Sequence, residues 1–113
     1  MPHAVVEYSR NLEGSFDAAA LMRACHNNLL ASDQFAETDI KVRLYACDHA
    51  LIAGQSATFL HTTVYLLSGR AKDTKKEIAD RLLAELVAFN LPTASCSVDV
   101  REIDRQIYAK TTG

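Results

Sequence analysis

One strand–helix–strand pattern occurs twice in the sequence, and this duplication restricts the possible folds more than any other feature. The first copy spans about residues 2–49 and the second about 58–104, and a polar tail follows at 105–113. Parallel strands joined by a helix cross over in a right-handed sense, so each copy is expected to form a βαβ unit with parallel strands. We therefore predict a single α+β domain over residues 1–113, with a four-stranded mixed sheet and both helices on one face.

Each copy contains one amphipathic helical stretch. The first is predicted over about 16–32, with Ser15 as its N-cap. Apolar side chains recur there at helical spacing: Ala18, Leu21, Met22, Cys25 and Leu29. The second is predicted over about 73–90, where Thr74 and Glu77 form a capping-box pattern. Both helices can bury one stripe against a sheet.

The strand segments alternate between apolar and polar residues, which separates a buried face from a polar one. The face away from the helices is expected to carry all or some of Lys41, Arg43, Tyr45, His61, Thr63, Tyr65, Asp99 and Arg101. This mixture is too polar for a core and rich in aromatic rings for a surface in open water. Two alternatives follow: the face is solvated, or it packs in an oligomer around a polar centre.

Composition excludes several function classes. The net charge is −2 and the isoelectric point about 6.0, so no basic field favours nucleic acid or an anionic membrane. No apolar run approaches the roughly 20 residues that a transmembrane helix requires. The N-terminal segment lacks the basic and apolar regions of a signal peptide. We therefore expect a cytoplasmic protein.

The three cysteines do not predict a metal site. Cys25, Cys47 and Cys96 form no CxxC pair, which fits reduced thiols that pack as small apolar side chains. Histidines follow two of them, in Cys25-His26 and Cys47-Asp48-His49, but neither segment has the paired spacing of a zinc site. No metal and no cofactor are predicted.

The chain begins with Met1-Pro2, ahead of the first strand segment. Proline cannot donate to a β ladder, so the first residue of a strand is one of the few places that suit it. Removal of Met1 would in addition leave Pro2 as a secondary amine that can act as a base. With Met1 attached, the Pro2 nitrogen is an amide and cannot.

Four stretches resemble the tautomerase superfamily, and more narrowly the 5-carboxymethyl-2-hydroxymuconate isomerase family. They are PHAVVEYS, IKVRLYACD, FLHTTVYLLSGR and KKEIADRLLAEL, and the resemblance covers about residues 2–103. It implies an isomerase that moves a proton in a small unsaturated 2-keto acid, with a place in aromatic-compound catabolism. It also implies an acidic small-molecule substrate and a homotrimer.

The resemblance assigns roles to individual residues. Pro2 is implied to be the base, and Arg43 and Arg70 stand where arginines of the family lie near the substrate carboxylates. Lys41 stands where the family usually has arginine; lysine keeps the charge but lacks the bidentate fork that grips a carboxylate. His3 also matches, and we expect it to have a structural role.

The chemistry of the implied base agrees with this set of cations. An α-amine titrates at about 7.7–8.0, and burial and nearby positive charges both lower its pKa toward neutrality. Lys41, Arg43 and Arg70 could therefore tune the base, bind the acid and stabilise a dienolate. Two other readings remain: a non-catalytic or changed-activity ligand-binding oligomer on the same scaffold, and an RNA-binding sheet, which the acidic isoelectric point disfavours.

Overall fold

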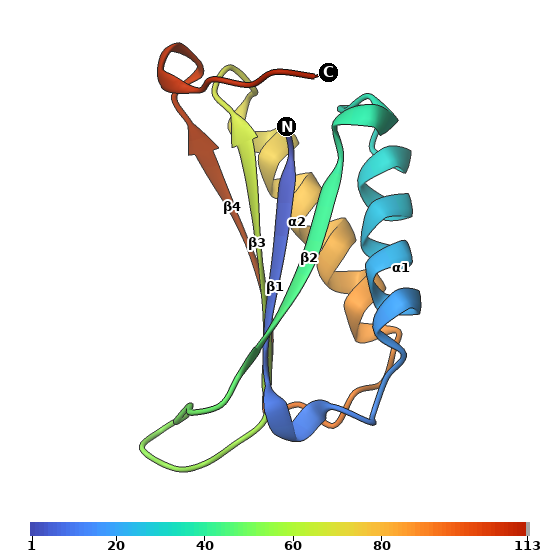
Figure 1. Cartoon of the computed structure of the whole chain (residues 1–113), viewed down its shortest axis with the longest axis vertical. Helices are drawn as coiled ribbons and strands as arrows, with labels where there is room; N and C mark the ends of the chain where they lie inside the picture. The colour runs from blue at the N-terminus through green and yellow to red at the C-terminus, as the bar shows by residue number, and fades with distance from the viewer. Residues whose placement is uncertain (113) are drawn as a thin grey trace.

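The computed structural model describes residues 1–112 and contains one sheet covered by two α-helices (Figure 1). The elements in chain order are β1 (His3–Ser9), α1 (Ala18–Ala31), β2 (Lys41–Cys47), β3 (Phe59–Leu67), α2 (Lys72–Val87) and β4 (Ser95–Ile103). Three short 3-10 helices accompany them: η1 (Arg10–Leu12), η2 (Glu37–Asp39) and η3 (Arg105–Ile107). This order confirms the duplicated strand–helix–strand pattern.

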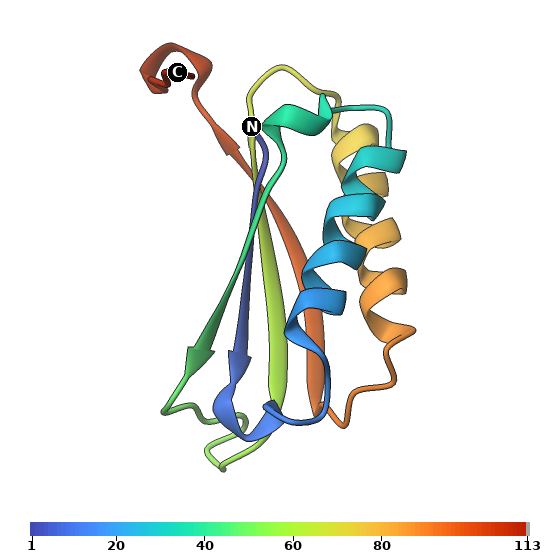
Figure 2. The same cartoon turned by 45° about the vertical axis from the view of Figure 1, so that its right-hand side comes forward.

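The four strands form one mixed sheet in the order β2-β1-β3-β4. Strand β1 pairs in parallel with β2, β3 pairs in parallel with β4, and the central pair β1–β3 is antiparallel. Both helices lie on the same face of the sheet, side by side (Figure 2). The predicted α+β class, mixed sheet and single helical layer are confirmed.

The core lies between the helices and the face of the sheet that they cover. Helix α1 contributes Leu21, Cys25 and Leu29 to it, and α2 contributes Ile78, Leu82 and Leu86. The strands contribute alternate residues, among them Ala4, Val6, Leu60, Val64 and Leu66. One polar side chain is completely buried with them: the hydroxyl oxygen of Thr62 has no hydrogen-bond partner among the described residues.

The predicted helix caps are wrong at both helices. Helix α1 is capped by Asp17, whose side chain accepts from the Ala19 backbone N–H at 3.0 Å, rather than by Ser15. The backbone N–H of Ser15 instead donates to the carbonyl of Leu12, because Ser15 still belongs to the turn that follows η1. Helix α2 begins at Lys72 with no side-chain cap, so Thr74 already lies inside its first turn and cannot serve as the cap.

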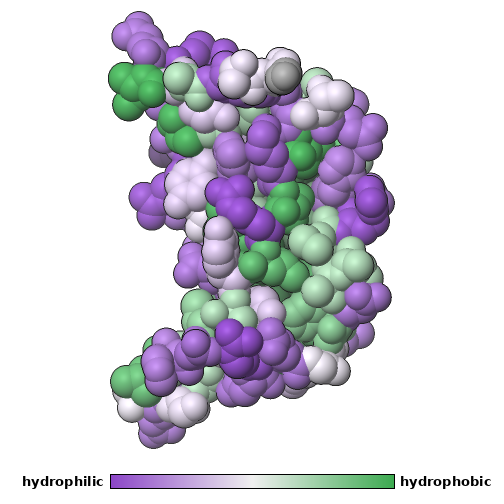
Figure 3. Space-filling model, in the orientation of Figure 1, coloured by the Kyte–Doolittle hydropathy of each residue, from purple (hydrophilic) through white to green (hydrophobic). Residues whose placement is uncertain are grey.

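The other face of the sheet is not covered by any element of the described chain (Figure 2). The strand register places His3, Val5, Arg43, Tyr45, Thr63 and Tyr65 on this face, which we call the open face. In space-filling view the molecule is hollowed on this side, between the tail after β4 and the loop 48–58 (Figure 3). Neither α-helix of the described chain is long and apolar enough to cross a membrane.

Candidate active site

A cavity of about 450 Å³ opens at the end of the sheet where β1 begins and β3 ends. Figure 1 shows the chain after β4 crossing this end, so that the two ends of the described chain lie near each other. Three segments besides the N-terminus supply the wall: the chain after α1, the turn after β3 and the tail. The lining residues are Met1, Gln34, Phe35, Ala36, Asp39, Leu67, Arg70, Arg105, Tyr108 and Lys110.

The N-terminus of the chain forms one side of this cavity. Met1 is only 8% exposed, and Pro2 beneath it is fully buried at the start of β1. Burial lowers the pKa of the terminal amine, and the charge of Lys41 lowers it further. The charges of Lys110, in the tail, and of Arg70 lower the pKa of this amine further, while the charge of Asp39 raises it. An amine at this end of β1 is therefore easier to deprotonate than an amine in water.

Lys41 and Arg43 follow one another on the same face of β2 but serve different surroundings. Lys41 lies at the strand start, where its Nζ donates to the backbone carbonyl of Asp39 at 2.8 Å. Arg43, two residues or roughly 7 Å further along the strand, lines a separate hollow of about 460 Å³ on the open face. There its guanidinium lies 3.1 Å from Nδ1 of His3. Arg43 thus lies outside the lining of the N-terminal cavity.

His3 occupies the border between the cavity and the open face. Its Nε2 lies 3.3 Å from the hydroxyl of Tyr108, and its Nδ1 faces Arg43. Burial, followed by the charges of Arg43 and Lys41, lowers the pKa of His3. These two contacts link the first strand, the second strand and the tail.

Arg70 lines the cavity and is held by neutral partners. It follows the turn after β3, and its guanidinium donates to the backbone carbonyl of Gln34 at 2.8 Å and to the side-chain oxygen of Gln34 at 3.2 Å. It also lies over the ring of Phe35, 4.8 Å from the ring centre, in a cation–π contact. Burial, and then the charge of Arg105, lower the pKa of Arg70.

The tail supplies three lining residues that sequence reasoning did not single out. Arg105 donates from its guanidinium to the backbone carbonyl of Ser68, and Lys110 forms an ion pair with Asp39 at 2.7 Å. Tyr108 reaches His3 from the same segment. In the sequence, the only sign that the tail could contribute to an anion-binding site is the presence of two cations after the last strand. The tail has no apolar periodicity that would predict where it packs.

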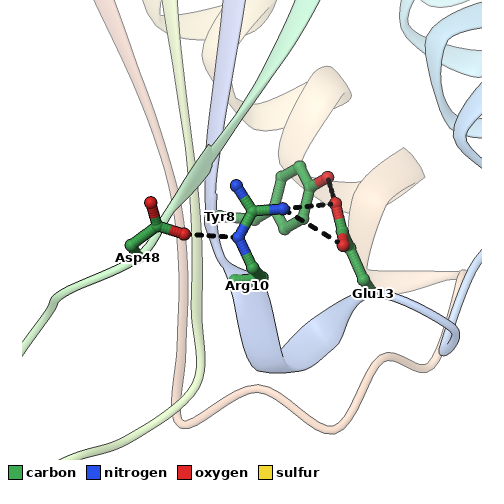
Figure 4. A network of polar contacts seen from close by, with 4 residues as sticks. All are labelled: Tyr8, Arg10, Glu13 and Asp48. Carbon is green, nitrogen blue, oxygen red and sulfur yellow. Dashed lines mark hydrogen bonds and ion pairs between the residues drawn. The ribbon is translucent and has the colours of Figure 1, made fainter.

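The cavity carries an excess of positive charge. Asp39 is the one carboxylate among its described lining residues, and Lys110 already pairs with it. Conditions differ at the opposite end of the sheet, where Arg10 contacts Asp48 and Glu13, and Glu13 also accepts from Tyr8 at 2.9 Å (Figure 4). Cations at that end are neutralised, whereas those at the N-terminal end can attract an anion.

The residues 1–112 contain no group of three or more His, Cys, Asp or Glu side chains that could hold a metal ion. The lining of the cavity offers an amine, cations, a phenol, one carboxylate, one side-chain amide and backbone groups. Such a set can bind an acid and hold or move a proton.

Comparison with known proteins assigns the fold to a family. A family model described as 5-carboxymethyl-2-hydroxymuconate isomerase matches residues 2–112. No curated protein sequence gave a significant match. Among solved structures, a 5-carboxymethyl-2-hydroxymuconate isomerase from Deinococcus radiodurans R1 is 26% identical, with a TM-score of 0.85 over 99% of this chain and 90% of that one.

Two further structures share the fold at lower identity. A 5-carboxymethyl-2-hydroxymuconate delta-isomerase is 22% identical, with a TM-score of 0.74 over 100% of this chain and 89% of that one. A fused 4-OT protein, described as a symmetric trimer, is 20% identical, with a TM-score of 0.82 over 98% of this chain and 93% of that one. The family match over nearly the whole length and the shared fold agree: the chain belongs to the 5-carboxymethyl-2-hydroxymuconate isomerase family.

Proposed function

We propose that the protein is an isomerase that moves a proton within a small unsaturated 2-keto acid, with Pro2 as the base after removal of Met1. The observation that carries the proposal is the cationic cavity at the start of β1, where Met1 covers Pro2. Without Met1, the secondary amine of Pro2 would line the cavity in its place. Family membership supports the reaction class.

The proposed reaction needs no group beyond the amine and the cations. The neutral amine removes a proton from the carbon beside the carbonyl, or from the 2-hydroxyl when the substrate is supplied as its enol, and the electron pair of the broken bond is delocalised as a dienolate. The protonated amine then returns the proton to a carbon further along the conjugated chain. Burial and the charge of Lys41, which lower the pKa of the terminal amine in this position, would favour the neutral form of a Pro2 amine there more than water does.

Arg70, which lines the cavity, and Lys41, whose charge acts on the terminal amine although it does not line the cavity, have a second role in this proposal, because the substrate is an acid. Arg70 is held in place by Gln34 and Phe35 and would bind a carboxylate with little loss of side-chain freedom. Lys41 would stabilise the negative charge of the dienolate. A lysine at this position is less selective for a carboxylate than the arginine of the family pattern.

Arg43 enters the proposal through assembly. Its hollow on the open face is separate from the cavity of its own chain, so Arg43 would contact substrate only where a second chain covers that face. Fused 4-OT proteins that share this fold are described as symmetric trimers. We extend a homotrimer to this chain as part of the proposal, with Arg43 facing the cavity of a neighbouring subunit.

A second candidate is a ligand-binding oligomer without catalysis. It is favoured by one observation: the sequence has Lys41 where the family pattern usually has arginine, while the cationic cavity is still formed. Such a protein would bind small acids and leave them unchanged. The two candidates therefore differ in turnover, and not in binding.

The test is an assay of enol-to-keto conversion of 2-hydroxymuconate, with protein whose N-terminus has been identified by intact-mass measurement. Protein that begins at Pro2 should catalyse the conversion. Pro2→Ala should lower the rate roughly 10²-fold or more, as expected for loss of a general base. Pro92→Ala, which changes the only other proline of the chain, should leave the rate unchanged. Full turnover by protein that retains Met1 would remove Pro2 from the mechanism.

A further inference from the structure

Two arginines line the same cavity without a carboxylate partner. Arg70 comes from the turn after β3 and Arg105 from the tail, and neither forms an ion pair with an acidic residue of the described chain. Their hydrogen bonds go to the oxygens of Gln34, Leu67 and Ser68, which are all neutral. By contrast, Arg10 at the opposite end of the sheet has two acidic partners. Two unneutralised guanidinium groups in one cavity favour an anion between them.

Arg105 is fixed to the wall of the cavity by the turn after β3. Its backbone N–H donates to the hydroxyl of Ser68 at 3.2 Å, and two of its guanidinium nitrogens donate to the carbonyl of Ser68 at 3.1 and 3.3 Å. The guanidinium also lies over Gly69, where a Cβ would come within 3.9 Å of it. Arg70 is the next residue of the chain, so this turn sets both arginines next to each other.

Donors of Arg105 are still available for a ligand. A guanidinium has five N–H donors in a planar fork, and the Ser68 carbonyl is the only acceptor that the described residues give the Arg105 guanidinium. The two cations repel each other: the pKa of Arg70 is lowered mainly by burial and, to a smaller extent, by the positive charge of Arg105. A bound carboxylate would remove this repulsion and occupy the free donors.

Two contacts hold the rest of the tail in the position that this site requires. Lys110 pairs with Asp39 at 2.7 Å, and the hydroxyl of Tyr108 lies 3.3 Å from Nε2 of His3. The ion pair leaves the cavity without a free carboxylate, because it occupies Asp39, the one acidic residue of the described lining. The tail thus contributes positive charge and removes negative charge at the same time.

We propose that Arg105 is a specificity-determining residue, and that it forms with Arg70 one anion site that binds a carboxylate of the substrate. The use of this site in catalysis rests on the proposed isomerase function; the binding of a carboxylate does not. The tail after β4 is then part of the substrate site. The substrate class is narrowed to acids that place a carboxylate between these two arginines.

The experiment measures binding and turnover separately, on the full chain. Adipate, a saturated dicarboxylate that cannot react, is titrated by calorimetry into the unaltered protein, Arg105→Gln, Arg105→Lys and Lys76→Gln. Lys76 is an exposed cation on α2, so its variant loses the same charge outside the cavity. We expect Arg105→Gln to weaken adipate binding about tenfold or more, Arg105→Lys to weaken it less, and Lys76→Gln to leave it unchanged.

In the 2-hydroxymuconate assay, Arg105→Gln should raise KM by a similar factor and leave kcat nearly unchanged, because the interaction is made equally in the ground and transition states. Equal adipate affinity in Arg105→Gln and the unaltered protein would overturn the proposal, as would an unaltered protein that fails to bind adipate at millimolar concentration. A protein that binds adipate through Arg105 but turns nothing over would instead overturn the isomerase function and leave the anion site standing.

Discussion

At the scale of single residues, Lys41 has the largest charge effect on the N-terminal amine, after burial itself. Its positive charge destabilises the protonated amine and so lowers the pKa. Lys41→Gln should therefore raise the pKa of the N-terminal amine, and, if that amine is the proposed base, the rising limb of kcat/KM against pH should move to higher pH. The measurement is a pH–rate profile.

Arg43→Gln is the matched control for this pH–rate profile, because it removes one positive charge from the same strand. Within one chain, Arg43 lowers the pKa of His3 and lines a separate hollow on the open face. The sequence had suggested that both cations tune the base. The Lys41 variant is expected to shift the rising limb more than the Arg43 variant, because Arg43 would reach an amine only across a subunit contact. Equal shifts in the two variants would show that Arg43 also acts on the amine.

Thr62 carries a buried hydroxyl with no partner among the described residues, which is unfavourable because the oxygen has lost its bond to water. Replacement by valine keeps the shape and removes the polar atom. Thr62→Val should increase the free energy of unfolding by about 1 kcal/mol and raise Tm by a few degrees. Thermal unfolding followed by circular dichroism measures this.

The contrasting variant is Thr58→Val, since the hydroxyl of Thr58 donates to the carbonyl of Pro92 at 2.6 Å and accepts from the Ala94 N–H at 3.2 Å. That substitution removes both hydrogen bonds and leaves the Pro92 carbonyl without this donor, although the Ala94 N–H keeps its bond to the Thr58 backbone carbonyl at 2.8 Å; it should lower Tm. A lower Tm for Thr62→Val as well would indicate that its hydroxyl finds a partner, such as water.

At the scale of elements, the start of α1 depends on Asp17. Its side chain accepts from the Ala19 N–H and satisfies one of the free donors of the first turn. Asp17→Ala should cost about 1 kcal/mol of stability, whereas Ser15→Ala should cost little, because Ser15 lies outside the helix. Urea unfolding of both variants decides between the two positions, and a larger loss for Ser15→Ala would restore the original prediction.

The same scale shows how much the sequence could predict. Periodicity identified every strand and both helices, because a two-residue alternation and a helical stripe are local properties of the chain. The caps were missed because Ser15 and Asp17 are equally suited to the role in sequence, and only the turn after η1 selects between them. Local patterns place elements more reliably than they place the ends of elements.

The candidate site was predicted in part for a related reason. Motif resemblance pointed to Pro2, Lys41 and Arg70, which come together at one end of the sheet. The tail could not be placed, since its ion pair joins Lys110 to Asp39 across 71 residues and no local pattern encodes such a contact. Arg43 was grouped with the others because a strand pattern shows which face a residue occupies, and not how far along the strand each hollow extends.

At the scale of the whole molecule, the open face is the surface that assembly would cover. Tyr45 is 54% exposed on it, and the loop and tail that carry the exposed Leu51 and Ile107 project from the same side (Figure 1). A chain of 113 residues also leaves much of its surface in water when alone. Burial of this face would give the proposed trimer its driving force.

Tyr45→Glu should dissociate that trimer and abolish turnover, because it places a charge in the interface. Val87→Glu is the control: Val87 is 56% exposed on α2, on the helical side, and its variant should remain assembled and active. Light scattering gives the mass of each. An unaltered protein that is monomeric at micromolar concentration and fully active would contradict both the trimer and the shared site.

The antiparallel pair β1–β3 at the centre of the sheet has a consequence for the number of sites. A half-turn about an axis through that pair exchanges the two βαβ units and carries the start of β1 onto the start of β3. The start of β3 is Phe59, inside the chain, where the nitrogen is always part of a peptide bond. Chemistry that requires a free amine can therefore occur only at the end of the sheet where β1 begins, and not at the opposite end, where β3 begins. The end where β3 begins can therefore be occupied by the ion pairs of Arg10. Two βαβ units joined in one chain have one free terminal amine, and hence one possible reactive centre, whereas two separate βαβ chains would have two.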